Sequence, residues 1–189
     1  MAASLGLSFV QGTSCNKTAG VKELYSIPVS DLVSITPSTT NHSVTDITFQ
    51  TAGNGFGRIY FKRGECEVTE SFERENEVTV NFAVPNPTKE QRFELEKIRK
   101  SCEQVMVARL YDRDELLIIG YDAIGGFESF ATFQSEESTT GRAKTDDNLT
   151  QFNMVALQSE LIRTISSLTG AGATTTDDMV VELLAATNV

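Results

Sequence analysis

The sequence has no tryptophan and a single histidine, His42, among its 189 residues. His42 lies in a turn rich in Ser, Thr and Asn, where a solvent-exposed side chain is expected. A catalytic Ser-His-Asp or Cys-His arrangement would therefore need another histidine, and metal clusters built on histidine ligands are excluded on the same ground. The sequence thus gives no support to the common hydrolytic and zinc-dependent enzymes.

Cysteine is scarce, and long apolar runs are missing. The three cysteines, Cys15, Cys66 and Cys102, lie far apart and form no CxxC pair, so zinc-binding and redox motifs are unsupported. We expect reduced thiols, with Cys66 and Cys102 on apolar faces. No apolar run approaches the roughly 20 residues of a membrane-spanning helix. Residues 1–12 lack the basic region and long apolar run of a signal peptide, so the sequence predicts neither a membrane anchor nor secretion.

Positive charge is also in short supply. The chain has 16 Lys and Arg against 26 Asp and Glu, which gives a formal net charge of −10. Proteins that wrap DNA or grip phosphate need a basic surface. This balance therefore argues against such a role.

The negative charge that is present is concentrated between residues 65 and 84, ECEVTESFERENEVTVNFAV. Apolar side chains recur at even positions, and the odd positions up to residue 77 carry carboxylates and hydroxyls. Side chains of a strand alternate between two faces, so this pattern predicts a long hairpin with a reversal at residues 74–76. One face packs on a core; the other is either an ordinary solvated face or an acidic surface past which a polyanion moves without sticking. The candidate residues of that surface are Glu65, Glu67, Glu73, Glu75 and Glu77.

Motifs for enzymatic chemistry are weak. Asp112, Asp114 and Glu115 could hold a cation, but the twelve-residue calcium-loop pattern is missing and an acidic turn explains them better. Residues 53–57, GNGFG, lack the Lys and Ser/Thr of a phosphate-binding loop and precede an expected strand rather than a helix. Regularly spaced glutamates on one strand face suit a bulk electrostatic surface better than an acid/base pair. We therefore expect no enzyme activity, no cofactor and no metal site.

The remaining chain reads mainly as short strands separated by turn residues. Expected strands are 21–27, 31–36, 44–50, 57–62, the two arms of the 65–84 hairpin, 104–111, 115–121, 127–133 and 149–157. Residues 135–147 are polar and are expected to form either a mobile loop or a hairpin edge. Residues 159–167 fit a helix or a strand equally well.

One segment has the pattern of a helix. Thr88 and Gln91 fit a capping box. In this motif the Thr88 hydroxyl accepts a hydrogen bond from the backbone amide of Gln91, and the Gln91 carboxamide accepts one from the backbone amide of Thr88. Apolar residues then recur at spacings of three and four at Leu95, Ile98, Cys102 and Val105. This predicts one helix over about 88–104, packed across the open face of a sheet. The expected architecture is a mainly antiparallel β-sandwich or barrel over residues 21–157, with an N-terminal arm, 1–20, and a C-terminal extension, 158–189, that ends in a short helix.

Two stretches carry a resemblance to a known family. They are residues 15–36, CNKTAGVKELYSIPVSDLVSIT, and residues 105–157, which include YDRDELLIIGYDAIGGFESF and GRAKTDDN. In order they give a Gly-containing arm, a first strand, a strand–acidic turn–strand unit that ends at Gly120, and a polar loop before the final strand. This order resembles tail-tube-like structural proteins of tailed bacteriophages, of the kind found in phages of Bacteroidetes. The resemblance covers roughly residues 15–157 and rests on turn chemistry and pattern.

The resemblance implies a virion structural protein that assembles as a homo-oligomeric ring or tube in the phage tail or neck. Such rings join their hairpins into a continuous inner barrel, and DNA passes through the bore without sequence-specific binding. The acidic face of Glu65 to Glu77 suits that bore. Neighbouring tail, neck or portal proteins are the expected partners. Two alternatives stay open: a head-completion or tail-terminator ring protein, and a soluble β-rich binding module that uses residues 135–147 to hold a ligand.

Overall fold

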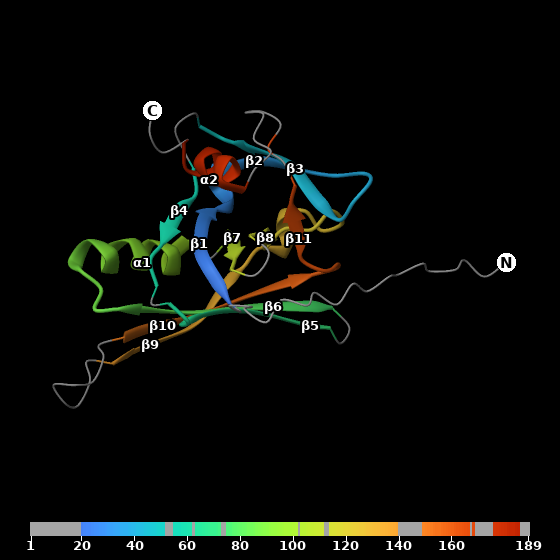
Figure 1. Ribbon diagram of the computed structural model, residues 1–189. Helices are drawn as coiled ribbons and strands as arrows, with labels where there is room; N and C mark the ends of the chain where they lie inside the picture. The colour runs from blue at the N-terminus through green and yellow to red at the C-terminus, as the bar shows by residue number, and fades with distance from the viewer. Residues whose placement is uncertain are drawn as a thin grey trace, which may run out of the picture.

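The computed structural model describes residues 20–51, 55–61, 63–72, 75–101, 103–111, 114–139, 149–166, 168 and 176–185. They form a mainly β structure with two sheets and two α-helices, as expected from the sequence (Figure 1). The strands are β1 (Val21–Pro28), β2 (Leu32–Pro37), β3 (Ser43–Phe49), β4 (Gly57–Ile59), β5 (Cys66–Phe72), β6 (Asn76–Pro85), β7 (Gln104–Leu110), β8 (Leu116–Ile119), β9 (Thr132–Thr139), β10 (Leu149–Gln158) and β11 (Arg163–Ile165). The helices are α1 (Lys89–Ser101) and α2 (Thr176–Ala185), and η1 (Val29–Asp31) and η2 (Phe127–Ser129) are short 3-10 turns.

The two sheets form layers of a sandwich. One has seven strands in the order β2-β3-β11-β8-β7-β1-β4, and the other has four in the order β5-β6-β10-β9. All strand pairs are antiparallel except β11 with β3, which is parallel. The core between the layers includes Val80, Phe82 and Met154 from the smaller sheet, packed against Met106 and Ala108 of the larger one.

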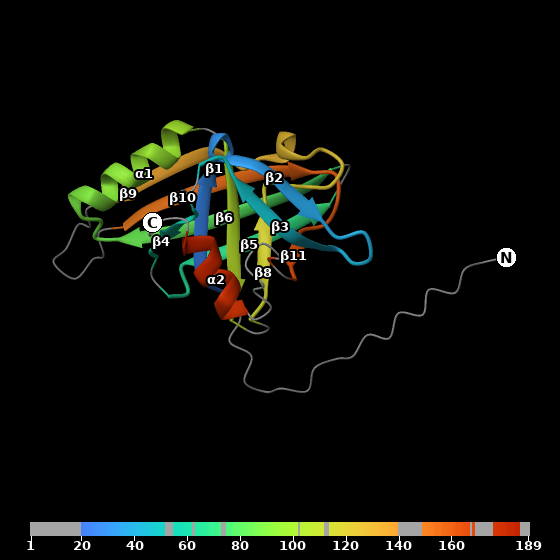
Figure 2. The same ribbon diagram turned by 90° about the horizontal axis from the view of Figure 1, so that it is seen from above.

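The seven-stranded sheet is buried on its other face too. Val105 and Val107 alternate with Met106 and Ala108 along β7, and they pack in a second cluster that includes Met179 and Leu183 of α2. Figure 2 shows α2 lying across β1 and β7 on this side. Because both faces of the sheet are covered, β8 and the centre of β7 from Val105 to Ala108 are continuous apolar runs rather than alternating ones.

Helix α1 begins where its capping box places it. The backbone amide of Gln91 donates to Thr88 Oγ1 at 3.2 Å, and the amide of Thr88 donates to Gln91 Oε1 at 2.9 Å. Leu95 is buried and Ile98 half-buried against the inter-sheet core, so the predicted stripe is confirmed at these positions. The helix ends at Ser101, earlier than 104, because Gln104 already belongs to β7; Cys102 lies outside the described residues.

Part of the C-terminal extension expected from residue 158 lies inside the sandwich. Strand β11 lies inside the seven-stranded sheet between β3 and β8, and α2 buries Met179 and Leu183 in its core. The described part of the C-terminal extension is therefore integral to the sandwich. The expected N-terminal arm lies outside the described residues, apart from Gly20.

Candidate functional site: the outer face of the four-stranded sheet

The acidic hairpin forms as expected, with its two faces clearly separated. In the β5–β6 register, Cys66 lies opposite Phe82 and Val68 opposite Val80, and these residues pack inward. Adjacent residues on a strand point to opposite faces, so the pairs between them point outward. These outward pairs are Glu67 with Asn81, Thr69 with Thr79, and Ser71 with Glu77.

Strands β10 and β9 continue this outer face with polar residues. Asn153 pairs with Asn81 of β6 on one side and Ser135 of β9 on the other, and Gln151 pairs with Glu137. The Asn153 Nδ2 group donates to Asn81 Oδ1 at 2.9 Å, which links the amides across two strands. The outer face thus carries carboxylates, amides and hydroxyls, beside the apolar Val155 and Leu157 of β10, of which Leu157 is 53% exposed.

No basic residue offsets the carboxylates within these strands. The four strands contain five glutamates, Glu67, Glu70, Glu77, Glu136 and Glu137, and neither Lys nor Arg. Of these, Glu67, Glu77 and Glu137 are exposed on the outer face. Charges of one sign on a concave or flat wall add to a local potential that repels polyanions.

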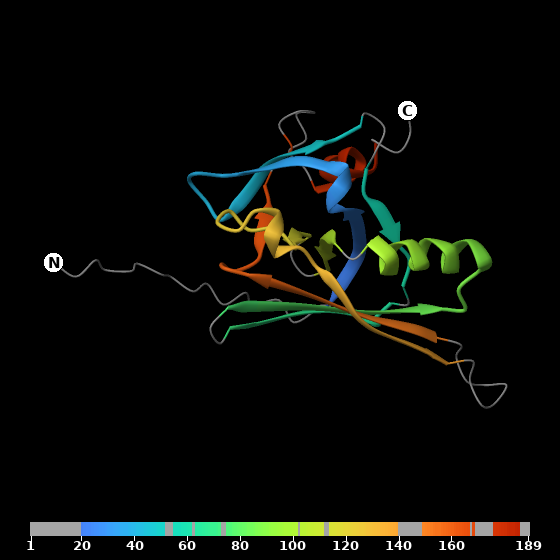
Figure 3. The same ribbon diagram turned by 180° about the vertical axis from the view of Figure 1, so that it is seen from behind.

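The face is hollowed at its centre and left open to solvent. A depression of about 350 Å³ is lined by Glu65, Glu67, Glu137 and by the amide residues Asn81, Gln151 and Asn153 among others. Figures 1 and 3 show no other element of the described chain beneath this sheet. The acidic face is therefore uncovered by the described part of the chain.

The structure brings together some of the predicted residues of this face. Glu67 and Glu77 point outward from β5 and β6, and Glu65 lines the depression just before β5. Glu75 is exposed in the turn before β6 rather than on the sheet face, and Glu73 lies outside the described residues. Asn76, expected in the reversal, is instead the buried first residue of β6.

Glu137 is a residue of this face that the sequence pattern did not reveal. Residues 135–147 were expected as a loop or a hairpin edge, and residues 135–139 form the end of edge strand β9; residues 140–148 lie outside the described part. The usual alternation fails here because Glu136, on the inner face, is itself polar; it lines a small hollow together with Arg92 and Glu96 of α1. No apolar residue follows Phe133 in β9, so the rest of this strand lacks the apolar–polar alternation that indicates a strand in the sequence.

Among the residues that the structure describes, no strand pairs with either edge of the small sheet. Strands β5 and β9 end the order of the four-stranded sheet, and they have similar lengths of 7 and 8 residues. An edge strand presents backbone N–H and C=O groups that another strand can pair with. The acidic face is thus bordered on both sides by surfaces suited to strand pairing.

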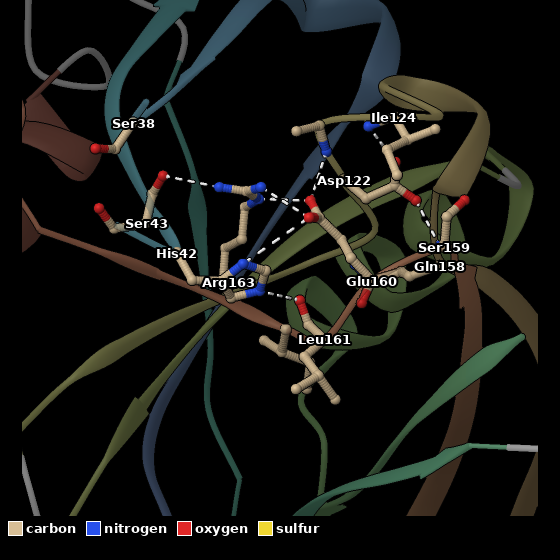
Figure 4. Close-up of polar contacts among 12 residues, drawn as sticks. Ser38, His42, Ser43, Asp122, Ile124, Gln158, Ser159, Glu160, Leu161 and Arg163 are labelled. Atoms are coloured by element: carbon tan, nitrogen blue, oxygen red, sulfur yellow. Dashed lines mark hydrogen bonds and ion pairs between the residues drawn. The ribbon is translucent and has the colours of Figure 1, made fainter. Parts of the chain in front are cut away.

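A buried polar network fixes the loops at one end of the sandwich (Figure 4). Asp122 is fully buried and accepts hydrogen bonds from the Ser129 hydroxyl at 2.6 Å and from the amides of Ile124 and Ser159, each at 2.8 Å. Burial raises the pKa of Asp122, but these donors outweigh it and hold the pKa below the usual range. The carboxylate therefore stays ionised and ties the 121–129 loop to the end of β10.

Glu160 connects the same region to β3 and β11. Arg163 donates to its two carboxylate oxygens at 2.5 and 2.7 Å, and the amide of Ala123 donates at 2.7 Å. These bonds, led by that from Arg163, lower the pKa of Glu160. His42 is exposed, as expected, with Nε2 at 2.6 Å from the Leu161 carbonyl oxygen. The arrangement is structural, since every charged group has a partner within the fold.

A second ion-pair network fixes α2. The Arg109 side chain is 7% exposed and donates to both oxygens of Asp114 at 2.6 and 2.9 Å, to Asp177 at 2.6 Å and to Glu23 at 3.2 Å. The bond from Arg109 is the main reason that the pKa of Asp114 lies below its ordinary value. Thr176, the first residue of α2, donates its hydroxyl to the Asp114 carbonyl oxygen at 2.7 Å.

The described residues contain neither a clustered set of metal ligands nor a membrane-spanning helix. No group of three or more His, Cys, Asp or Glu side chains among them is arranged to hold a metal ion. Within the same residues, no helix is long and apolar enough to cross a membrane. Cys66 is buried as expected, and burial raises the pKa of its thiol to about 12, so it is an inert core residue.

Comparisons with known proteins identify no relative. No family model, no curated protein and no solved structure matches the chain. The function is therefore argued from the geometry and charge of the subunit and from the resemblance described above.

Proposed function

We propose that this protein is a virion structural component of a tailed bacteriophage that forms a ring or tube around a DNA channel. The observation that supports this best is the outer face of the four-stranded sheet, which is acidic, without Lys or Arg in its strands, and uncovered in the described subunit. The resemblance to tail-tube-like proteins in residues 15–157 points to the same class. The proposed location is the virion, after assembly in the host cytoplasm.

The charge of this face suits a wall that DNA slides past. Double-stranded DNA carries a phosphate charge about every 1.7 Å along its axis, and Lys or Arg contacts to phosphate create salt-dependent affinity. Glu67, Glu77 and Glu137 repel phosphate and offer no such contact. Because electrostatic forces are screened within about 8 Å at physiological salt, only charges on the wall itself act on passing DNA. DNA would thus move through without sequence-specific binding.

The edges of the same sheet suit assembly into a ring. If the β5 edge of one subunit pairs with the β9 edge of the next, the contact is head-to-tail and the four-stranded sheets join into one continuous barrel. The acidic face of each copy then lines the bore, and neighbouring tail, neck or portal proteins would stack on the ring. A tube protein, a neck ring and a head-completion or tail-terminator ring share this requirement.

The second candidate function is a soluble β-rich binding module. The depression of about 350 Å³ on the acidic face favours it, because such a hollow could hold a basic ligand. Negative-stain images of the purified protein separate the two functions. Rings with a central hole support the channel protein, and a monomer of uniform size supports the binding module.

Charge reversal on the face tests the channel itself. In phage particles that carry Glu67→Lys with Glu77→Lys, we expect normal rings but slower or stalled DNA release, eased by raising the salt concentration. The control is Glu103→Lys with Glu128→Lys, which changes the charge equally at exposed positions outside the four strands. If the two double variants release DNA at the same rate as the parent, the face is only a solvated surface and the channel proposal fails.

A further inference from the structure

Helix α1 lies beside β4 at the end of the seven-stranded sheet (Figures 1 and 3). A groove runs between these two elements. It consists of two adjoining hollows of about 210 and 300 Å³, both lined by Arg58, Ile59, Glu94 and Ile98. The lining is largely apolar in the first hollow, which also contains Val84, Leu95 and Tyr60. Tyr60 is 63% exposed, although it lies against this apolar surface.

One wall of the groove is an open strand edge. Strand β4 pairs with β1 on one side, with Ile59 opposite Leu24 and Gly57 opposite Ser26, and it ends the strand order of its sheet. Its other edge therefore points its backbone groups toward the groove. An open edge beside apolar pockets is the combination by which proteins bind an extended segment as an added strand.

The chain contains a segment with the matching pattern. In residues 4–9, SLGLSF, the apolar Leu5, Leu7 and Phe9 alternate with small polar or glycine residues, which is the period of a strand with one apolar face. Residues 4–9 contain no charged side chain, and the charges that line the groove balance, with Arg58 and Lys97 beside Glu90 and Glu94. The apolar pattern of the segment thus matches the apolar lining of the first hollow.

The segment is also long enough to reach the groove. Residues 10–19 span up to about 33 Å when extended. They join the described chain at Gly20, only four residues before Leu24, the partner of Ile59 in β4, and four strand residues cover roughly 13 Å. The groove of the same subunit is within this reach, and the groove of an adjacent copy is available to the same segment in an assembly.

We propose that the groove between α1 and β4 is a strand-docking site and that residues 4–9 of this polypeptide are its occupant. Leu5, Leu7 and Phe9 cover Ile59, Val84, Leu95 and Ile98, and the backbone of the segment pairs with the open edge of β4. Docking would protect that edge from non-specific pairing. The groove is separate from the acidic face, so the docking proposal does not depend on the channel proposal.

Cysteine cross-linking in the full-length chain tests the docking. In a background with Cys15→Ser and Cys102→Ser, Ser8→Cys places a thiol on the polar face of the segment, and Tyr60→Cys places one at the groove. The matched control replaces Tyr60→Cys with Val33→Cys, which is exposed on β2, the opposite edge of the same sheet. We expect several-fold more disulfide with position 60 than with position 33. Equal yields at the two positions would overturn the proposal.

Two further variants separate docking from chance contact. Leu7→Asp would place an unpaired charge in the apolar groove and should lower the yield at position 60 about tenfold, whereas Ser4→Asp should leave it unchanged. On a non-reducing gel, a monomeric product means docking within one chain, and a dimeric product means docking on another copy; both place the segment in the groove. An undiminished yield for Leu7→Asp contradicts the apolar docking.

Discussion

Asp122 shows at the scale of one residue how the loops at the end of the sandwich are fixed. Its buried carboxylate holds three amides and a hydroxyl from the segments 124–129 and 159. The carboxylate is shielded from bulk solvent, because Asp122 is 0% exposed. The charge of Asp122 is therefore part of the stability of the fold.

Asp122→Asn should lower the free energy of unfolding by about 1–3 kcal/mol at pH 7, because buried donors lose a charged acceptor. The folded-state pKa lies below the unfolded value of about 3.9, so the stabilisation is present above pH 4 and is lost as the pH falls through the folded pKa. Urea denaturation of both proteins between pH 7 and pH 2.5 checks this. A gap between parent and variant that stays constant down to pH 2.5 would contradict the role of the charge.

Gly120 is required by both its backbone angle and its surroundings. It has φ +86°, and a Cβ there would lie 2.7 Å from the Gln104 carbonyl oxygen and 2.8 Å from the Ala131 amide nitrogen. Those two residues hydrogen-bond to each other across the β7–β9 bridge. Gly120 therefore sits where no side chain fits.

Gly120→Ala should lower the free energy of unfolding by more than about 2 kcal/mol, because the added Cβ clashes with its neighbours and the backbone angle is also strained for alanine. Gly64→Ala is the control, because Gly64 has φ +83° with nothing within 4 Å of its Cβ position. Gly64→Ala should lower the free energy of unfolding only by the strain of an alanine in the left-handed region, about 1–2 kcal/mol. Chemical denaturation measures both, and equal costs would mean that the bridge moves aside without penalty.

At the scale of elements, the sequence predicted those strands and helices that have a clear local residue pattern. Hairpin β5–β6 follows from strict alternation, and α1 begins at its capping box. Strand β11 could not be distinguished from a helix, because three residues carry no period and its place depends on β3 and β8, far apart in the chain. On the acidic face, Glu67 and Glu77 were found by alternation, whereas Glu137 was missed because its neighbour Glu136, on the inner face, is also polar and breaks the alternation.

Helix α2 is the element whose role differs most from expectation. Leu183 is 0% exposed in the core cluster beneath the seven-stranded sheet, and the Leu183 carbonyl accepts from the amide of Phe56 at 3.0 Å. Arg109 fixes the start of the helix through Asp177. The helix thus covers a sheet face that would otherwise be exposed.

Leu183→Ala should lower the free energy of unfolding by about 2–5 kcal/mol, the usual cost of removing a buried leucine side chain. Val181, on the same helix, is 64% exposed, so Val181→Ala should change stability by less than about 0.5 kcal/mol. Denaturant titrations of the two variants provide the comparison. If Leu183→Ala lowers the free energy of unfolding as little as Val181→Ala does, α2 does not contribute to the stability of the sandwich.

At the scale of the whole molecule, the charge of −10 and the open sheet edges act in opposite directions. Net charge of one sign keeps copies apart, whereas unpaired edges bring them together. Pairing of β5 with β9 would satisfy the edges while the acidic faces line a water-filled bore. A ring would therefore pair the backbone groups of both open edges and leave the acidic faces in water.

The orientation of β5 allows a direct test of this assembly. The Glu65 carbonyl accepts from the Ala83 amide at 2.9 Å, so odd-numbered residues of β5 bond to β6. Hydrogen-bonded and non-hydrogen-bonded pairs alternate along an antiparallel ladder, so the amide of Val68 points to the open edge. Val68→Pro removes that donor without removing a β5–β6 hydrogen bond, and proline is tolerated at such edge positions.

We expect Val68→Pro to remain folded by circular dichroism and to fail to form the oligomer of the parent in light scattering. Val68→Thr is the matched control, because it keeps the amide and a β-branched side chain of similar size, and it should assemble. A parent that is monomeric at high concentration contradicts self-association. If the parent assembles and Val68→Pro assembles equally well, the subunits associate through another surface, and the acidic faces need not meet around a common bore.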